Sequence, residues 1–283
     1  MTSLLDWANR KPSWKSSTRQ TTSPEVEPVK QDTPGGGSIA VISGKGGVGK
    51  TWLSVSLAEA LASPECRPML FDGDLGLANV DIQLGLMPKR NLADIVFKDF
   101  PLEDAILDAG TFDVLPGASG TGALTEIGPE QFQMLASKLY QMGQNYPVTL
   151  YDLGSGITRP IVHLALSAKM VLVLITADPS SLTDAYAVIK ILRACDENVK
   201  IVCAVNLAES TVQGRETYQS FARVCETHLS FRPECAGVIR RDEKVIEAIR
   251  SQTNLLKMHP QSLAVRDVRD MARWLENERF GAL

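Results

Sequence analysis

Long apolar segments are absent from this 283-residue chain, and no uninterrupted run approaches the roughly 18 residues that a transmembrane helix requires. The first residues also lack the apolar stretch of a secretory signal, so we expect a cytoplasmic protein. Cysteine and histidine are scarce, with five and three residues respectively. No two cysteines have the two-residue gap of a metal knuckle or redox pair, so we expect reduced thiols and no structural metal site.

A strong charge of one sign is also missing, because 29 basic and 33 acidic residues leave a formal net charge of −4. This balance gives no global attraction to nucleic acid or to an anionic membrane. Hydrophobic residues make up 44% of the chain, which is ordinary for a globular protein. The length is sufficient for one large α/β domain or two small ones.

Residues 1–37 have no periodic apolar pattern and are rich in Ser, Thr, Pro and Gly. Such a segment cannot bury enough apolar surface to offset the entropy lost on ordering, so we predict a disordered arm. Leu4, Leu5 and Trp7 form a small apolar cluster near its start. The cluster is either a chain end without a role or a short linear motif that folds onto a partner.

From Ser38 onward, apolar strand-like runs alternate with helical patterns. Strands are expected at 38–43, 67–74, 112–117, 148–156, 168–177, 200–207 and 235–239. Helices are expected at 51–62, 130–142, 181–195 and 261–276, with one more between the last two strands. Nearly continuous apolar strands alternating with helices indicate a parallel sheet covered on both faces. We therefore predict a single doubly wound, mostly parallel α/β domain over residues 38–283.

The sequence SGKGGVGKT follows the first expected strand and precedes a helix. It satisfies the P-loop pattern G-x-x-x-x-G-K-[ST], in which backbone N–H groups and a helix N-terminus surround a phosphate. Lys50 is predicted to contact the β- and γ-phosphates, and Thr51 to bind Mg²⁺. The alternative is a glycine-rich turn without a ligand. The nucleotide-binding residues of this loop are Gly44, Lys45, Gly46, Gly47, Val48, Gly49, Lys50 and Thr51.

Acidic residues follow two of the expected strands. Asp152 ends one strand, and its carboxylate is predicted to hold a Mg²⁺-bound water, while the N–H of Gly156 reaches the γ-phosphate. Asp72 and Asp74 end another, where carboxylates beside a metal and a phosphate can orient an attacking water. The alternative for Asp72 and Asp74 is a turn at the end of a strand.

Lys45 is a second lysine in the loop, where its side chain would point away from its own nucleotide. A cation there can serve a nucleotide bound across an interface, as an arginine finger does in trans. That role requires a dimer in which two nucleotides face each other.

The pattern K-G-G-x-G-K-T resembles the deviant Walker A motif of the MinD/ParA ATPases. Within that family, the segments DGDLGLANVDIQLGLMPKRNLADIV, VLPGASG and SSLTDAYAVIKIL are similar to the flagellar number and placement regulators of the FlhG (FleN) branch. The resemblance covers about residues 38–260.

The resemblance implies a sandwich homodimer that forms with ATP and hydrolyses it slowly. Lys45 would then reach the partner's phosphates, and Asp74 would position the attacking water. Asp72 and Asp152 would serve the Mg²⁺ shell. Asn206 would bond the adenine edge, unless it is a simple turn asparagine.

The resemblance also implies a regulator of flagellar number or placement with flagellar partners. These would be the signal-recognition-type GTPase (FlhF-type), a flagellar transcription activator or a C-ring protein. The protein would be cytoplasmic, or peripheral at the inner membrane or cell pole.

Several residues depart from the family pattern. Trp52 replaces a small polar residue; its N–H still serves the α-phosphate, but its ring must pack somewhere. Arg240 stands where proline is usual, which puts one wall of the base pocket in doubt. LGSG replaces the usual Ala-Gly ending of the second switch, although Gly156 is kept. The arm lacks the Asp-Gln-Ala motif, which puts activation of a GTPase through the arm in doubt.

Two other functions remain as alternatives. A ParA-like partition or positioning ATPase acting on DNA or another cargo would need a basic stripe. Five residues could form one, but acidic residues interrupt it, so DNA binding is not expected: Arg240, Arg241, Lys244, Arg250 and Lys257. A binding module that holds ATP without hydrolysis is the other alternative, and Asp74 speaks against it. A dehydrogenase is not expected, because the loop is not G-x-G-x-x-G.

The C-terminal segment has an apolar stripe at helical spacing, formed by Val265, Val268, Ala272 and Leu275. The stripe either covers the domain core, which we favour, or binds the inner membrane. Matched arginines and acidic residues on the polar face leave few anchors for lipid: Trp274, Phe280 and Leu283. We therefore expect weak membrane association or none.

Overall fold

The computed structural model describes residues 36–74, 78–98, 100–117 and 127–280. The predicted arm over residues 1–37, including Leu4, Leu5 and Trp7, lies almost wholly outside this part of the chain, as does Leu283. The first strand begins at Gly37, where the backbone N–H bonds to the carbonyl of Pro147 at 2.9 Å.

The described residues form an eight-stranded sheet in the order β3-β4-β2-β5-β1-β6-β7-β8. Neighbouring strands are parallel except β3 and β4, which pair antiparallel at one edge. This confirms the predicted mostly parallel sheet, with all seven expected strands present and the short β3 missed. The strands are β1 (Gly37–Ser43), β2 (Met69–Gly73), β3 (Leu107–Asp108), β4 (Asp113–Leu115), β5 (Val148–Ser155), β6 (Met170–Ile175), β7 (Ile201–Ala208) and β8 (Glu234–Arg240).

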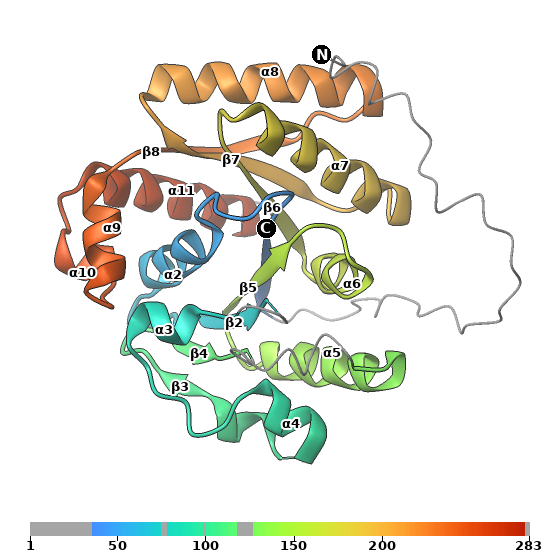
Figure 1. The fold of residues 1–283 in the computed structure, drawn as a ribbon, viewed down its shortest axis with the longest axis vertical. Coiled ribbons are helices and arrows are strands. Elements are labelled where there is room, and N and C mark those ends of the chain that lie inside the picture. The colour runs from blue at the N-terminus through green and yellow to red at the C-terminus, as the bar shows by residue number, and fades with distance from the viewer. Residues whose placement is uncertain (1–35, 75–77, 99, 118–126, 281–283) are drawn as a thin grey trace, which may run out of the picture.

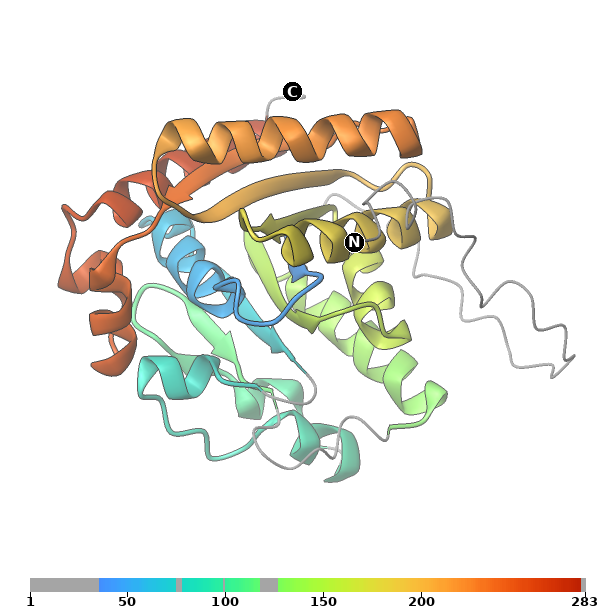
Figure 2. The same cartoon turned by 45° about the horizontal axis from the view of Figure 1, so that its top comes forward.

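Helices cover both faces of the sheet (Figures 1 and 2). One hydrophobic core lies between the sheet and five helices: α4 (Leu92–Lys98), α5 (Pro129–Gly143), α6 (Arg159–Ser167), α7 (Pro179–Cys195) and α8 (Thr211–Leu229). The other core lies against α2 (Lys50–Leu61), α3 (Val80–Leu84), α9 (Glu243–Arg250), α10 (Leu255–Met258) and α11 (Leu263–Phe280). A short 3-10 turn, η2, spans Leu102–Ala105.

The start of α7 lies two residues before the predicted one, and its cap explains why. The Asp178 side chain accepts a hydrogen bond from the N–H of Ser180, and Pro179 occupies the first turn. Both features favour a helix beginning at this point. Asp178 thereby becomes part of the edge of the sheet that carries the P-loop.

Helix α11 packs its apolar stripe against the sheet. Val265, Val268, Ala272 and Leu275 are all buried, so the preferred reading of a core-covering helix is confirmed. Trp274 is also partly buried against the same core. Burial of these side chains leaves little of the stripe for a lipid surface.

The connection that follows β1 occupies the point where the strand order reverses. From β1 the chain passes to β2 on one side of the sheet, and later strands add on the other side from β6 onward. In doubly wound sheets, ligands bind at this crevice beyond the carboxyl ends of the strands. The glycine-rich loop of residues 44–49 lies there.

Candidate functional site

The glycines of the loop are required by its backbone and by close neighbours. Gly47 and Gly49 have φ of 79° and 89°, in the left-handed region that favours glycine. A Cβ on Gly44 would lie 2.3 Å from the backbone carbon of Asp184 on α7. A Cβ on Gly49 would lie 2.4 Å from Nδ2 of Asn206. The loop is therefore held against both α7 and the end of β7.

The loop leaves an open cradle at the N-terminus of α2. No side chain caps this helix, and its first turn contains no acidic residue. Apart from its two chain neighbours, no heavy atom of the described residues lies within 4 Å of the position that a Cβ on Gly47 would take. Uncapped N–H groups at a helix N-terminus, beside glycines, form a site for an anion such as a phosphate.

Lys50 lies on the inner side of the loop. Its Nζ is 3.7 Å from Oδ1 of Asp152, and its side chain is 10% exposed. The distance is longer than a direct hydrogen bond, so the ammonium is not fully engaged by the carboxylate. Lys50 thus remains available to a phosphate in the cradle.

Asp152 is fully buried at the end of β5, and its two oxygens differ. Oδ1 accepts a hydrogen bond from the Ser54 hydroxyl at 3.1 Å. Oδ2 has no hydrogen-bond partner among the described residues. Burial raises the pKa of the Asp152 carboxyl, while Lys50 and the hydroxyls of Thr51 and Ser54 act in the opposite direction. An orphaned carboxylate oxygen beside the cradle fits a Mg²⁺-bound water.

Asp72 is directly beside Asp152 in the register of β2 and β5. Its carboxylate accepts backbone N–H groups from Asn79 at 2.8 Å, Val80 at 2.9 Å and Asp74 at 3.3 Å. Burial, and then the charge of Asp152, raise the pKa of the Asp72 carboxyl. Asp72 is thus bonded to backbone groups that follow β2, and its part in the Mg²⁺ shell or in orienting an attacking water stays a prediction.

Asp74 lies across the end of β5. A Cβ on Gly154 would be 3.3 Å from Oδ1 of Asp74, which places this carboxylate next to the strand that carries Asp152. The structure thus brings Asp72, Asp74 and Asp152 to one edge with Lys50, as their positions at strand ends predict.

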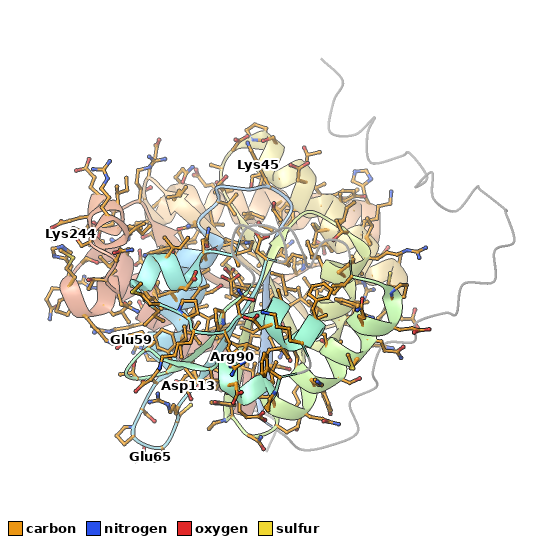
Figure 3. All side chains as sticks on the ribbon, turned by 60° about the horizontal axis from the view of Figure 1, so that its bottom comes forward. Lys45, Glu59, Glu65, Arg90, Asp113 and Lys244 are labelled. Atoms are coloured by element: carbon orange, nitrogen blue, oxygen red, sulfur yellow. The ribbon has the colours of Figure 1, made fainter. Side chains whose placement is uncertain are left out.

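Lys45 points outward from the loop (Figure 3). Its Nζ contacts Oδ2 of Asp178 at 2.7 Å and donates to Oγ of Ser180 at 2.6 Å. The Lys45 side chain is 41% exposed. The two lysines of the loop therefore differ: Lys50 faces Asp152 inside the fold, and Lys45 is held at the N-terminus of α7.

Other predicted nucleotide contacts have protein partners in this conformation. The amide of Asn206 donates to the carbonyl of Val48 at 2.8 Å, so it fixes the loop. The N–H of Gly156 donates to the carbonyl of Ser43 at 3.1 Å. The Trp52 ring is 5% exposed and packs in the core between the sheet and α2.

Arg240 turns toward α11. Its Nε and Nη2 bond to the two carboxylate oxygens of Asp267 at 2.8 and 2.6 Å. Lys257 contacts Glu59 at 3.2 Å. Both pairings reduce the basic stripe that binding to DNA would need. Lys244 on α9 remains exposed (Figure 3).

Three residues of this edge were not found from the sequence: Ser54, Asp178 and Ser180. Ser54 is four residues after Lys50, so the helical repeat places both on one face of α2. Asp178 and Ser180 lie between the strand expected at 168–177 and the helix expected at 181–195. Their proximity to Lys45 depends on how α7 packs against the loop.

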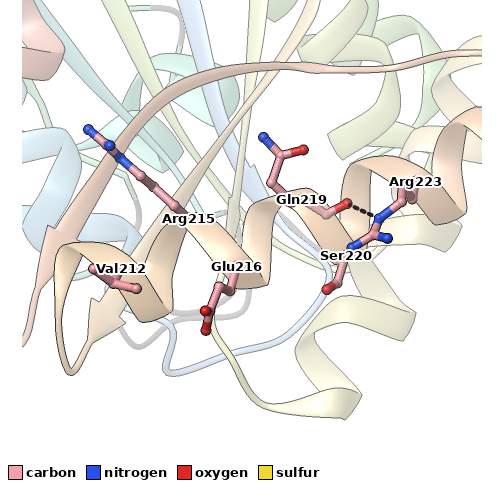
Figure 4. A pocket seen from close by; sticks show the side chains of 6 residues that line it. All are labelled: Val212, Arg215, Glu216, Gln219, Ser220 and Arg223. Atoms are coloured by element: carbon pink, nitrogen blue, oxygen red, sulfur yellow. Dashed lines mark hydrogen bonds between the residues drawn. The ribbon is translucent and has the colours of Figure 1, made fainter.

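A hollow elsewhere on the surface is formed by one face of α8 (Figure 4). Its lining side chains all come from that helix: Val212, Arg215, Glu216, Gln219, Ser220 and Arg223. Arg223 donates to the carbonyl of Gln219 at 3.3 Å, within the same helix.

Among the described helices, none has both the length and the apolar character to cross a membrane.

Residues 39–255 match the family described as the CobQ/CobB/MinD/ParA nucleotide binding domain. The chain belongs to this family. The predicted MinD/ParA-type P-loop ATPase is thus confirmed, and the matched domain is one that binds nucleotides. The matched range includes every predicted site residue.

Two curated relatives are flagellar proteins. The chain is 39% identical to the antiactivator FleN of Pseudomonas aeruginosa over 227 residues, which is 80% of this chain and 81% of FleN. It is 28% identical to the flagellum site-determining protein YlxH of Helicobacter pylori over 249 residues, 87% of this chain and 84% of YlxH. These similarities confirm the predicted likeness to the flagellar branch.

The fold is also that of a solved MinD. The structure of the septum site-determining protein MinD from Pyrococcus horikoshii, complexed with Mg-ADP, matches with a TM-score of 0.72 and 23% identity. The match covers 86% of this chain and 96% of that one. This likeness confirms the predicted fold.

Proposed function

We propose that the protein is an ATPase switch that dimerises with ATP and regulates the number or placement of flagella. The separation of the two loop lysines carries this proposal. Lys50 is inside the site at Asp152, whereas Lys45 is on the outer side at Asp178, where it cannot serve the same phosphates. A second copy of the chain supplies a site for Lys45.

The inner residues bind the nucleotide and its metal. The glycine loop and the N-terminus of α2 hold the phosphates, and Lys50 neutralises the β- and γ-phosphate charge. Thr51 and Asp152 would hold Mg²⁺, which would supply positive charge for the transferring phosphoryl group. Asp74 orients the attacking water. Asp72 supports the metal shell from its place beside Asp152 in the sheet.

Formation of the dimer requires local rearrangement. Lys45 leaves Asp178 and Ser180 to reach the partner's phosphates. Gly156 gives up its hydrogen bond to Ser43 and turns its N–H toward the γ-phosphate. Asn206 keeps its bond to Val48, and its side-chain oxygen accepts from the adenine edge. ATP thus changes the surface at the carboxyl edge of the sheet.

The similarity to FleN and YlxH supports a flagellar role. FleN is named an antiactivator, which favours a flagellar transcription activator as the partner over the FlhF-type GTPase and the C-ring protein. The protein acts in the cytoplasm or at the periphery of the inner membrane or cell pole. Arg240 and Lys257, being paired with carboxylates, give little support to the alternative of partition on DNA.

Deletion of the gene followed by counting of flagella tests this proposal. We expect an altered number or position, restored by the wild-type gene but not by Lys50→Ala, because the variant lacks the charge that binds the phosphates. Arg241→Ala, an exposed cation outside the site, is the matched control and should restore flagellation. Normal flagella in the deletion strain would overturn the flagellar assignment.

A further inference from the structure

Ser54 connects the P-loop helix to the acidic end of β5. Its side chain is completely buried, and its hydroxyl lies 3.1 Å from Oδ1 of Asp152 and 3.0 Å from the carbonyl of Lys50. Lys50 and Ser54 are one helical turn apart, so the hydroxyl is placed where the helix carrying the P-loop lysine meets Asp152.

The Ser54 hydroxyl can donate either to the Lys50 carbonyl within α2 or to the Asp152 carboxylate on β5. A charged carboxylate is a stronger acceptor than a backbone carbonyl, so the hydroxyl hydrogen favours Asp152 when that residue is ionised. With Oδ1 held in this way, the carboxylate has a fixed rotation. Oδ2 is then the oxygen left without a partner in the part of the chain that the structure describes.

We propose that Ser54 is a positioning residue for the magnesium site, because its hydroxyl fixes one oxygen of Asp152 and so directs the other at the metal-bound water. This inference rests on the proposed nucleotide and metal site. Ser54 does not touch the nucleotide. It acts only through Asp152, as partners of metal-binding groups commonly do.

The same helix provides a matched control. Ser56 is also buried, at 1% exposure, but its hydroxyl has no hydrogen-bond partner within the described residues. Ser54→Ala and Ser56→Ala remove the same atom from the same buried helix. Only the first removes a contact to Asp152.

The test is a titration of a fluorescent ADP analogue on the full-length protein at increasing Mg²⁺ concentration. For Ser54→Ala, we expect the Mg²⁺ concentration at half-maximal effect to rise about tenfold, while nucleotide affinity in EDTA stays within about twofold of wild type. Ser56→Ala should match wild type in both. Ser54→Thr keeps the hydroxyl and should restore the wild-type Mg²⁺ midpoint.

Thermal unfolding in EDTA checks that each variant is folded. If Ser54→Ala does not fold, Ser54→Cys, which keeps the size but donates weakly, should show the same shift. A wild-type Mg²⁺ midpoint for the variant without the hydroxyl, or an equal shift in Ser56→Ala, would overturn this role. Absence of any Mg²⁺ effect on wild-type nucleotide binding would instead overturn the proposed metal site.

Discussion

Lys45 and Lys50 belong to one loop but are held by different carboxylates. Lys50 approaches the buried Asp152 without a full hydrogen bond, and Lys45 forms a short ion pair with Asp178. The Lys45 contact, followed by the N–H of Ser180, lowers the pKa of the Asp178 carboxyl to about 2. Asp178 therefore remains ionised at every physiological pH, and the pair holds Lys45 at the N-terminus of α7.

Asp178→Asn should release Lys45 while keeping the cap of α7, because asparagine caps helices as well as aspartate. We expect dimerisation with Mg-ATP at a protein concentration roughly two- to fivefold lower, measured by sedimentation. Asp196→Asn, at the other end of α7, is the control. A higher required concentration would mean that Asp178 helps Lys45 in the dimer instead.

The pair of Lys45 and Asp178 also determines how the effect of Asp178→Asn on dimerisation depends on pH. Because the pKa of the Asp178 carboxyl is lowered, the ion pair contributes its full stabilisation at any pH above the ordinary aspartate pKa of about 4. This stabilisation is lost only as the pH falls toward 2, where the carboxyl becomes protonated. The ratio of the protein concentrations at which wild type and Asp178→Asn dimerise should therefore be constant between about pH 6 and about pH 8.

At the scale of elements, the strands were predictable because each is a nearly continuous apolar run bounded by turns. The short elements between β2 and β4 were not. Helices α3 and α4 are only five and seven residues long, too short for a clear period, and they form against tertiary neighbours. The loop residues of the site were predicted from motif and context. Their present partners were not, because contacts such as Asn206 with Val48 join distant parts of the chain.

The contact between β8 and α11 gives a prediction at this scale. Asp267 accepts the N–H of Arg240 at 3.0 Å in addition to its guanidinium, and its side chain is 9% exposed. Arg240→Ala leaves this carboxylate without its cation and should lower the free energy of unfolding by about 1–3 kcal/mol. Urea denaturation measures the loss, and the exposed Arg241→Ala should change stability by less than about 0.5 kcal/mol. Equal effects would show that the pair does not fasten α11.

Over the whole molecule, the predicted nucleotide and metal residues gather at the carboxyl edge of the sheet. The apolar stripe of α11 is turned into the core instead of toward solvent. Burial of this stripe removes it as a membrane anchor, which fits our proposal that partner proteins read the switch.

Flotation with anionic liposomes should accordingly recover little or none of the purified protein, even with Mg-ATP. Trp274 is partly buried, and a few side chains at the end of the chain give marginal binding at best. Deletion of residues 277–283 should leave this result unchanged. Strong flotation that disappears with the deletion would contradict it.

The most direct test of the switch is the mass of Asp74→Ala in Mg-ATP, measured by light scattering after size exclusion. Asp74→Ala should bind ATP and stall before hydrolysis, so we expect twice the mass of the chain. The same variant with Lys45→Ala should bind nucleotide yet have the mass of a single chain, because the cation supplied to the partner is gone. Equal masses for the two proteins with bound nucleotide, whether single or double, would contradict an ATP-driven dimer held by Lys45.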